Sequence, residues 1–235
     1  MINKKQKQKE KKMLKELKSG ANLGSSFNRG WAIYKKNFLP IFLATLLALV
    51  IGGVSCGICI APLMCGVFAM IFTALRSDDA KLNAGDVFKG FQKFLPAFVA
   101  SLVLGIISSI ANTVFMAIPI VGWIALIVVC YAVLPTVTIW SLMLVADQDA
   151  SIGDAIVVPL KLLGDKRFWS VVLVSFVAGI VGGLGAIALG IGILVTLPLA
   201  YCIIAAAYEE AYAGGGAQED AVPVIESAGD ASAAS

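Results

Sequence analysis

Three long stretches of this chain contain no charged residue and no histidine, and they limit what the chain can fold into. They cover residues 37–75, 94–146 and 168–208. One crossing of a bilayer takes about 20 helical residues, and each stretch is about twice that length or somewhat more. We therefore expect each stretch to hold two transmembrane helices joined by a tight reversal, which gives six spans arranged as three hairpins.

Composition supports this all-α, polytopic helical membrane fold against other classes. Hydrophobic residues make up 59% of the chain and charged residues 14%, against roughly 25% charged residues in soluble domains. A soluble core helix would keep a polar face at helical period, and a β-barrel would alternate polar and apolar residues; the stretches do neither. A cleavable signal peptide is not expected, because the charged segment before Phe38 is long and further membrane segments follow.

The expected hairpins divide the chain into three parts. We predict a basic cytoplasmic tail over residues 1–24, a six-helix transmembrane domain over 25–210 and a disordered acidic cytoplasmic tail over 211–235. Pro135 is expected to kink or tilt the fourth membrane helix. The predicted helix pairs are 38–53 with 61–75, 95–111 with 118–145, and 169–181 with 192–207.

One sequence pattern occurs three times along the chain. The segment that begins Asn37-Phe38-Leu39-Pro40 aligns with Lys93-Phe94-Leu95-Pro96, 56 residues later, and a fainter third copy begins at Phe168-Trp169. A short stretch that mixes apolar and charged residues precedes each copy. The expected unit is an amphipathic interfacial helix followed by a membrane hairpin. Copies of such a unit share one orientation, unlike the inverted repeats of many transporters.

Charged residues fall at only one end of the predicted hairpins. All 18 Lys and Arg and all 15 Asp and Glu lie in the terminal segments or in the loops 76–93 and 147–167. The positive-inside rule makes that side cytoplasmic, so we expect a multi-pass protein of the cytoplasmic membrane with both termini in the cytoplasm. The Lys-rich residues 1–24 could lie on anionic lipid, although a solvated tail that only sets orientation is the favoured alternative. Nucleic acid is not an expected partner.

Aromatic residues close to basic residues mark segments expected to lie in the membrane interface. Rings at headgroup depth beside Lys and Arg are typical of helices that lie flat there. The candidate anchors are Phe27, Trp31, Tyr34, Phe88, Phe91 and Phe94. A third such helix is predicted over 151–163, with Ser151 and Asp154 spaced as in a capping box. These helices could bind lipid, and anchoring of the neighbouring spans is the preferred interpretation.

Residues that could carry chemistry are few. The chain has no histidine, and no ionisable residue lies inside the apolar stretches, where proton- or ion-coupled carriers usually keep one. We therefore predict no catalytic residue, no metal site and no cofactor. Cys56 and Cys59 could form a disulfide at the first external turn, although no basic residue lies nearby to activate a thiol.

The second hairpin carries a candidate polar face inside the membrane. Its residues are Ser101, Ser108, Asn112 and Thr138. They could line a path for a solute. Hydrogen bonding between packed helices explains the same residues with fewer assumptions.

Several short motifs resemble those of a known family. They are Gly30-Trp31-Ala32-Ile33-Tyr34, Gly85-Asp86-Val87-Phe88, Asp154-Ala155-Ile156 and Thr196-Leu197-Pro198-Leu199. On these motifs the chain resembles uncharacterised prokaryotic membrane proteins related to the membrane domain of bacterial glycerophosphodiester phosphodiesterases. The resemblance implies a six-helix membrane domain. It implies no phosphodiesterase activity, because that chemistry belongs to a separate soluble barrel in the family.

These observations favour a non-catalytic integral membrane protein that acts as a scaffold, a lipid-associated module or a partner of other membrane proteins. The alternative is a passive or exporter-type transporter of a small or amphipathic solute. A solvent-accessible cavity at mid-membrane, lined by Ser108, Asn112 and Thr138, would favour transport. A fully packed core would favour the scaffold.

Overall fold

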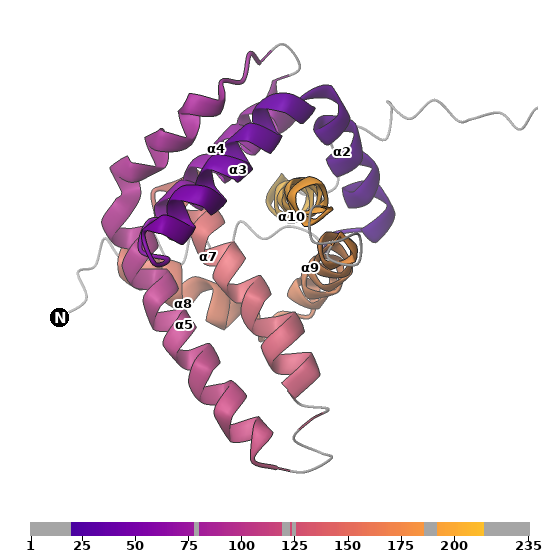
Figure 1. The fold of residues 1–235 in the computed structure, drawn as a ribbon. Coiled ribbons are helices and arrows are strands. Elements are labelled where there is room, and N and C mark those ends of the chain that lie inside the picture. The colour runs from indigo at the N-terminus through magenta and orange to yellow at the C-terminus, as the bar shows by residue number, and fades with distance from the viewer. Residues whose placement is uncertain (1–19, 78–79, 119–122, 124–125, 186–191, 214–235) are drawn as a thin grey trace, which may run out of the picture.

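The computed structural model describes residues 20–77, 80–118, 123, 126–185 and 192–213, which form helices joined by short connections (Figure 1). No β-strand occurs among these residues, so the predicted all-α fold is confirmed. Most of both predicted tails and the expected turn at Pro119 lie outside the described residues. The elements are α2 (Leu23–Lys36), α3 (Phe38–Val54), α4 (Ile60–Arg76), the 3-10 helix η1 (Ala84–Lys93), α5 (Phe94–Met116), the π-helix η2 (Leu126–Val133), α7 (Leu134–Gln148), α8 (Ile152–Leu162), α9 (Lys166–Leu184) and α10 (Ile193–Ala213).

The six predicted membrane helices correspond to α3, α4, α5, η2 with α7, α9 and α10. Four described helices are long and apolar enough to cross a membrane, and a fifth span results if α2 and α3, bent by 94°, are counted as one. The apolar helix α4 has only 17 residues, about 25 Å, so it would cross only where the bilayer is locally thinner. The membrane-protein fold is therefore confirmed with four to five spans, and the number six stays a prediction.

Pro135 lies where the fourth membrane helix changes its hydrogen bonding. The helix is a π-helix over η2 and becomes an α-helix at Leu134, with the proline in the first turn of α7. Proline has no N–H to donate to the carbonyl one turn earlier, and π-helical turns occur mostly as local irregularities inside α-helices. The change of helix type thus coincides with Pro135, and the kink or tilt expected there stays a prediction.

The first helices of the three hairpins bury equivalent positions. When Phe38, Phe94 and Phe168 are aligned, the residues three, six and ten positions later are all at most 1% exposed, whereas those one and twelve positions later are 49–62% exposed. The buried set comprises Ile41, Ala44 and Ala48 in α3, Ala97, Ala100 and Leu104 in α5, and Val171, Val174 and Ala178 in α9. This shared pattern agrees with the repeat in the sequence.

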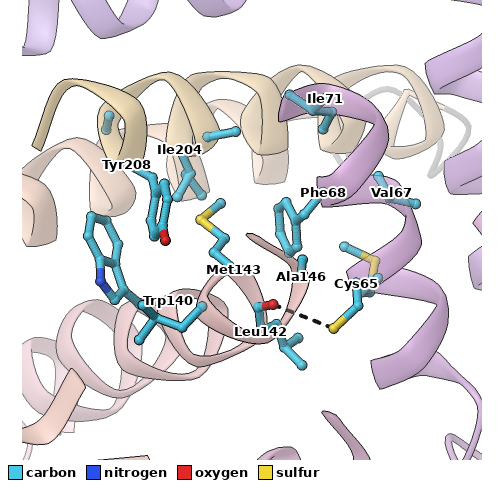
Figure 2. Close-up of a cluster of buried hydrophobic side chains, with 14 of the residues drawn as sticks. Cys65, Val67, Phe68, Ile71, Trp140, Leu142, Met143, Ala146, Ile204 and Tyr208 are labelled. Atoms are coloured by element: carbon cyan, nitrogen blue, oxygen red, sulfur yellow. Dashed lines mark hydrogen bonds between the residues drawn. The ribbon is translucent and has the colours of Figure 1, made fainter. Parts of the chain in front are cut away.

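The second helices of the hairpins, α4, α7 and α10, form the interior of the molecule. Their large side chains meet in one core, in which each is at most 3% exposed (Figure 2). These side chains are Phe68 and Ile71 from α4, Trp140 and Met143 from α7, and Ile204 and Tyr208 from α10. We call α4, α7 and α10 the inner helices, and α3, α5 and α9 the outer helices.

Two of the amphipathic segments pack on the hairpins. The 3-10 helix η1 lies so close to α4 that a Cβ on Gly66 would overlap the carbonyl oxygen of Val87. Helix α8 packs against α5 and α7. At its start Ser151 accepts a hydrogen bond from the Asp154 N–H at 3.3 Å and donates one to the Asp154 carboxylate at 2.7 Å. The expected pairing of Ser151 with Asp154 is thus confirmed.

Helix α2 packs against α10. Its contacts recur at successive turns, and they pair Asn22 and Ser26 with Glu210, Gly30 with Ile203, and Tyr34 with Val195. At the middle contact, a Cβ on Gly30 would lie 2.6 Å from the Cα of Ile203. Because Val195 and Glu210 lie near opposite ends of α10, α2 follows most of that helix. It is therefore part of the helix bundle, and only its opposite face is available to the surroundings.

Candidate functional site at the charged ends of the inner helices

Each inner helix carries a charged residue near its C-terminal end, and the three charges meet. The Arg76 guanidinium at the end of α4 donates to Asp147 Oδ1 of α7 at 2.6 Å, and its Nε donates to Glu209 Oε1 of α10 at 2.8 Å. The Arg76 side chain is 50% exposed, whereas those of Asp147 and Glu209 are 14% and 15% exposed. One cation thus joins carboxylates from two other helices. We call Arg76, Asp147 and Glu209 the charge triad.

Tyr208 connects the charge triad to the aromatic core beneath it. Its hydroxyl donates to Asp147 Oδ2 at 3.3 Å and accepts from Gln148 Nε2 at 3.2 Å. The centroid of its ring lies 4.8 Å from that of Trp140 and 5.1 Å from that of Phe72. Since Trp140 and Tyr208 are at most 1% exposed, side chains fill the space between the inner helices directly below the charges.

Aromatic packing rather than hydrogen bonding holds Trp140 in this core. Its indole N–H has no hydrogen-bond acceptor among the described residues, a deficit that costs about 1–3 kcal/mol when the donor is buried. Its ring stacks on Tyr212 at 5.9 Å and meets the edge of Phe168 at 5.4 Å. Such contacts, together with the burial of a large ring, offset the unsatisfied donor.

Glu210, the neighbour of Glu209, holds α2 against α10. Its Oε2 accepts hydrogen bonds from the Ser26 hydroxyl at 2.9 Å and from the Asn22 N–H at 3.1 Å. Arg29 lies 4.0 Å from its other carboxylate oxygen. The carboxylate therefore lies at the N-terminus of α2, where the helix dipole favours a negative charge.

Lys93 makes a comparable connection for the second hairpin. Its Nζ donates to the Ala146 carbonyl oxygen at 2.7 Å and lies 2.7 Å from the Asp149 carboxylate. A cation is favoured at this position, because unpaired carbonyl groups gather at the C-terminus of a helix such as α7. The charge triad, Glu210 and Lys93 together join the ends of α2, α4, α5, α7 and α10.

The chemistry of these charged groups suits structural contacts better than proton transfer. Arginine stays protonated under all physiological conditions, so Arg76 cannot take up a proton as a general base must. The carboxylates of Asp147 and Glu209 are both occupied by ion pairs with Arg76. The part of the chain that the structure describes also contains no group of three or more His, Cys, Asp or Glu side chains that could hold a metal ion.

The predicted aromatic anchors have different surroundings. The exposed rings are Phe27, Trp31, Phe88 and Phe91, at 36–47% exposure, and Phe94 is half-buried. Tyr34 is only 4% exposed, and its hydroxyl donates to the Val195 carbonyl oxygen at 2.7 Å. The structure therefore corrects the assignment of Tyr34 as an interfacial anchor, because the face of α2 that carries it packs on α10.

The candidate polar face consists of residues that satisfy their hydrogen bonds locally. The hydroxyls of Ser101, Ser108 and Thr138 each donate to a carbonyl oxygen of their own helix, at 2.8–2.9 Å. Asn112 is half-buried on α5. Ser101 lines an open groove of about 620 Å³ between α5 and the turn after α3, but the other three residues do not line it. These residues therefore do not form a common lining.

Cys56 and Cys59 lie in the turn between α3 and α4 and are free thiols in this structure. Cys56 is exposed and has a φ of 52°, followed by Gly57 with a φ of 87°. Left-handed backbone at two consecutive residues makes this turn tight. The disulfide that the sequence allows is not formed here.

The sequence does not predict the charge triad, and it indicates only that Arg76, Asp147 and Glu209 belong to the charges on the cytoplasmic side. A signal for it was available, because Arg76, Asp147 and Glu209 are each the first charged residue after one of the three uncharged stretches. Hairpins that share one orientation bring such residues to the same side of a membrane. Their mutual contact also requires the second helix of every hairpin to lie inside, which apolarity alone does not reveal.

No protein-family model matches the chain, and neither a curated protein nor a solved structure matches it. The resemblance to the membrane domain of bacterial glycerophosphodiester phosphodiesterases therefore stays a prediction. The site is interpreted from its own geometry.

Proposed function

We propose that this protein is a non-catalytic scaffold of a prokaryotic cytoplasmic membrane, with the charge triad and both termini on the cytoplasmic side. Four to five apolar helices support membrane embedding. The charged ends of five elements lie together around the triad, as the positive-inside rule requires of one membrane face. The partners of such a protein are membrane lipids, anionic lipid in particular, and other membrane proteins.

The observation that carries this proposal is the filled junction between the inner helices. Phe68, Trp140 and Met143 are each 0% exposed and Tyr208 is 1% exposed, and the ions of the charge triad lie directly above them. Protein interiors of this kind pack as densely as organic crystals, so a solute would have to displace large aromatic side chains to pass. Transport needs a binding site that opens to one side at a time, and the junction offers no such site.

One observation favours the alternative, a transporter of an amphipathic solute. The open groove of about 620 Å³ beside α5 is lined mainly by apolar residues, with Ser101 and Ser109 as its hydroxyl groups. An amphipathic molecule could lie in it. The groove is on the outer surface of the helix bundle, however, and in a membrane it faces lipid rather than a path through the protein.

The native thiols of the protein provide the test. Cys65 in α4 and Cys202 in α10 are 1% and 0% exposed in the inner helices, whereas Cys56 is exposed in the turn between α3 and α4. Intact cells and inverted membrane vesicles would be treated with a small, charged methanethiosulfonate reagent, and labelled peptides would be quantified by mass spectrometry. We expect Cys56 to react only from outside, and neither Cys65 nor Cys202 to react from either side.

The two conclusions can fail separately in this experiment. Reaction of Cys65 or Cys202 from one side, at a rate near that of Cys56, would show a water-filled path and would support a transporter. Reaction of Cys56 only in inverted vesicles would reverse the proposed orientation while leaving the closed core intact. Denatured protein, in which all five cysteines should react, serves as the control for labelling.

A further inference from the structure

The turn between α8 and α9 forms an open basic pocket. Its volume is about 640 Å³, and its charged lining residues are Lys161, Lys166, Arg167 and Asp165. All three cations are exposed at this surface. Asp165 is occupied as the N-cap of α9, since its Oδ1 accepts from the Arg167 N–H at 2.9 Å. The charged lining thus comprises three cations and one carboxylate, at the start of an apolar helix.

An apolar groove lies farther along α9, beginning two residues after Arg167. It has a volume of about 390 Å³, and α9 contributes Trp169, Val172, Leu173 and Phe176 to its lining. Val128 and Ala132 of η2 form its other wall. Trp169 and Leu173 are 49% and 55% exposed, although large apolar side chains are normally covered by protein or by lipid.

The pocket and the groove lie on the same face of α9. Lys166, Trp169, Leu173 and Phe176 recur at the spacing of one helical stripe. The ten residue-to-residue steps from Lys166 to Phe176 rise about 15 Å, which is half of the roughly 30 Å hydrocarbon thickness of a bilayer. Along this stripe, cations are followed by an exposed tryptophan and then by apolar residues. A phospholipid in one leaflet presents its phosphate, its glycerol backbone and its acyl chains in the same order.

We propose that this stripe binds one anionic phospholipid, with its phosphate held by Lys161, Lys166 and Arg167 and an acyl chain in the groove between α9 and η2. The inference deepens the proposed function, and it rests on the membrane embedding of α9. Charge complementarity selects an anionic over a zwitterionic headgroup. The groove selects a lipid over a soluble phosphate, because only a lipid has a chain to place there.

Native mass spectrometry of the purified full-length protein would test the proposal. The protein in detergent would be titrated with dioleoyl phosphatidylglycerol or dioleoyl phosphatidylcholine. Each cation near an anionic headgroup contributes about fivefold to affinity, so the variant K161Q/K166Q/R167Q should lose at least tenfold in phosphatidylglycerol affinity. The matched control K35Q/K36Q/K81Q removes the same charge from residues that are also exposed, and it should change that affinity by less than about twofold.

A second pair of variants tests the groove. W169A/L173A should weaken binding of both lipids by several-fold, whereas L95A/I106A, which alters residues of α5 that are 60% and 53% exposed, should not. Equal loss of phosphatidylglycerol affinity in the two charge variants would overturn the proposal, as would unchanged lipid binding in W169A/L173A. Thermal unfolding of every variant separates loss of the site from loss of the fold. Thiol labelling measures closure of the inner junction and not lipid selectivity, so the proposed function and this inference can fail independently.

Discussion

The inner and outer helices are both apolar, but they have different surroundings. Helices α3 and α4 have 17 residues each, and their only charged residue is Arg76 at the very end of α4, yet α3 buries 5 residues and α4 buries 12. In water an exposed apolar helix would be unfavourable. In a bilayer, lipid solvates such a helix as well as protein does, and position is decided by packing instead. The outer helices accordingly bury a narrow stripe, mostly of small residues such as Ala44 and Ala100, while the inner helices bury their bulky side chains as well.

Substitution of glycine should show the largest difference in stability cost between the inner and the outer helices. Gly66 of α4 has the Val87 carbonyl oxygen where its Cβ would lie, whereas Gly105 of α5 has no atom within 4 Å of that position. Gly66→Leu should therefore separate η1 from α4 and cost more than about 3 kcal/mol. Gly105→Leu should stay within about 1 kcal/mol of the wild type. The yield of monodisperse protein and the thermal midpoint in detergent measure both effects, and equal midpoints would refute the close contact.

One tryptophan in the inner helix α7 and one in the outer helix α9 should give the next largest difference in stability. Trp140 of α7 is 0% exposed and Trp169 of α9 is 49% exposed. Trp140→Ala should cost about 3–5 kcal/mol, because it leaves a cavity among the inner helices. Trp169→Ala should cost less than about 1 kcal/mol, since lipid or detergent replaces the lost ring. Thermal unfolding in one detergent compares them, and similar costs would mean that the inner core is less closely packed than the structure shows.

Substitutions in the charge triad should change the stability less, because Arg76 is half exposed and its ion pairs are screened by solvent. Arg76→Gln should destabilise the protein by about 1–2 kcal/mol through the two carboxylates left facing each other. Adding D147N and E209Q to this variant should recover part of the loss. Lys89→Gln, which removes an exposed pair with Asp86, should cost less than about 0.5 kcal/mol. A loss in R76Q that the added neutral residues do not relieve would point to the packing of Arg76 on Phe72 instead of its charge.

Much of the fold was predictable because apolarity and charge are read directly from the sequence. The uncharged stretches predict an all-α membrane protein, which is confirmed with four to five spans. The pattern at Phe38, Phe94 and Phe168 indicates the repeat that the burial of α3, α5 and α9 reproduces. Local chemistry was also predictable where few residues decide it. Ser151 and Asp154 pair as their spacing indicated, and Pro135 marks a change of helix type.

The contacts between helices were less predictable. Tyr34 and Trp31 belong to one aromatic pattern in the sequence, yet one is 4% and the other 41% exposed. The difference arises because Gly30 lets α2 approach the backbone of Ile203, a contact between residues far apart in the chain. The charge triad could not be predicted for the same reason, since it depends on which helix of each hairpin lies inside.

The charge triad also has a consequence for how the chain assembles. The three hairpins resemble one another in their first helices, so each could in principle take the place of another. Only the first hairpin ends in a cation, Arg76, while the other two end in Asp147 and Glu209. A bundle with two copies of the first hairpin would bring two cations together. A bundle without the first hairpin would bring only carboxylates together. Contacts between like charges disfavour both arrangements. One arginine thus identifies the hairpin made first during synthesis and defines the partners that the later two must find.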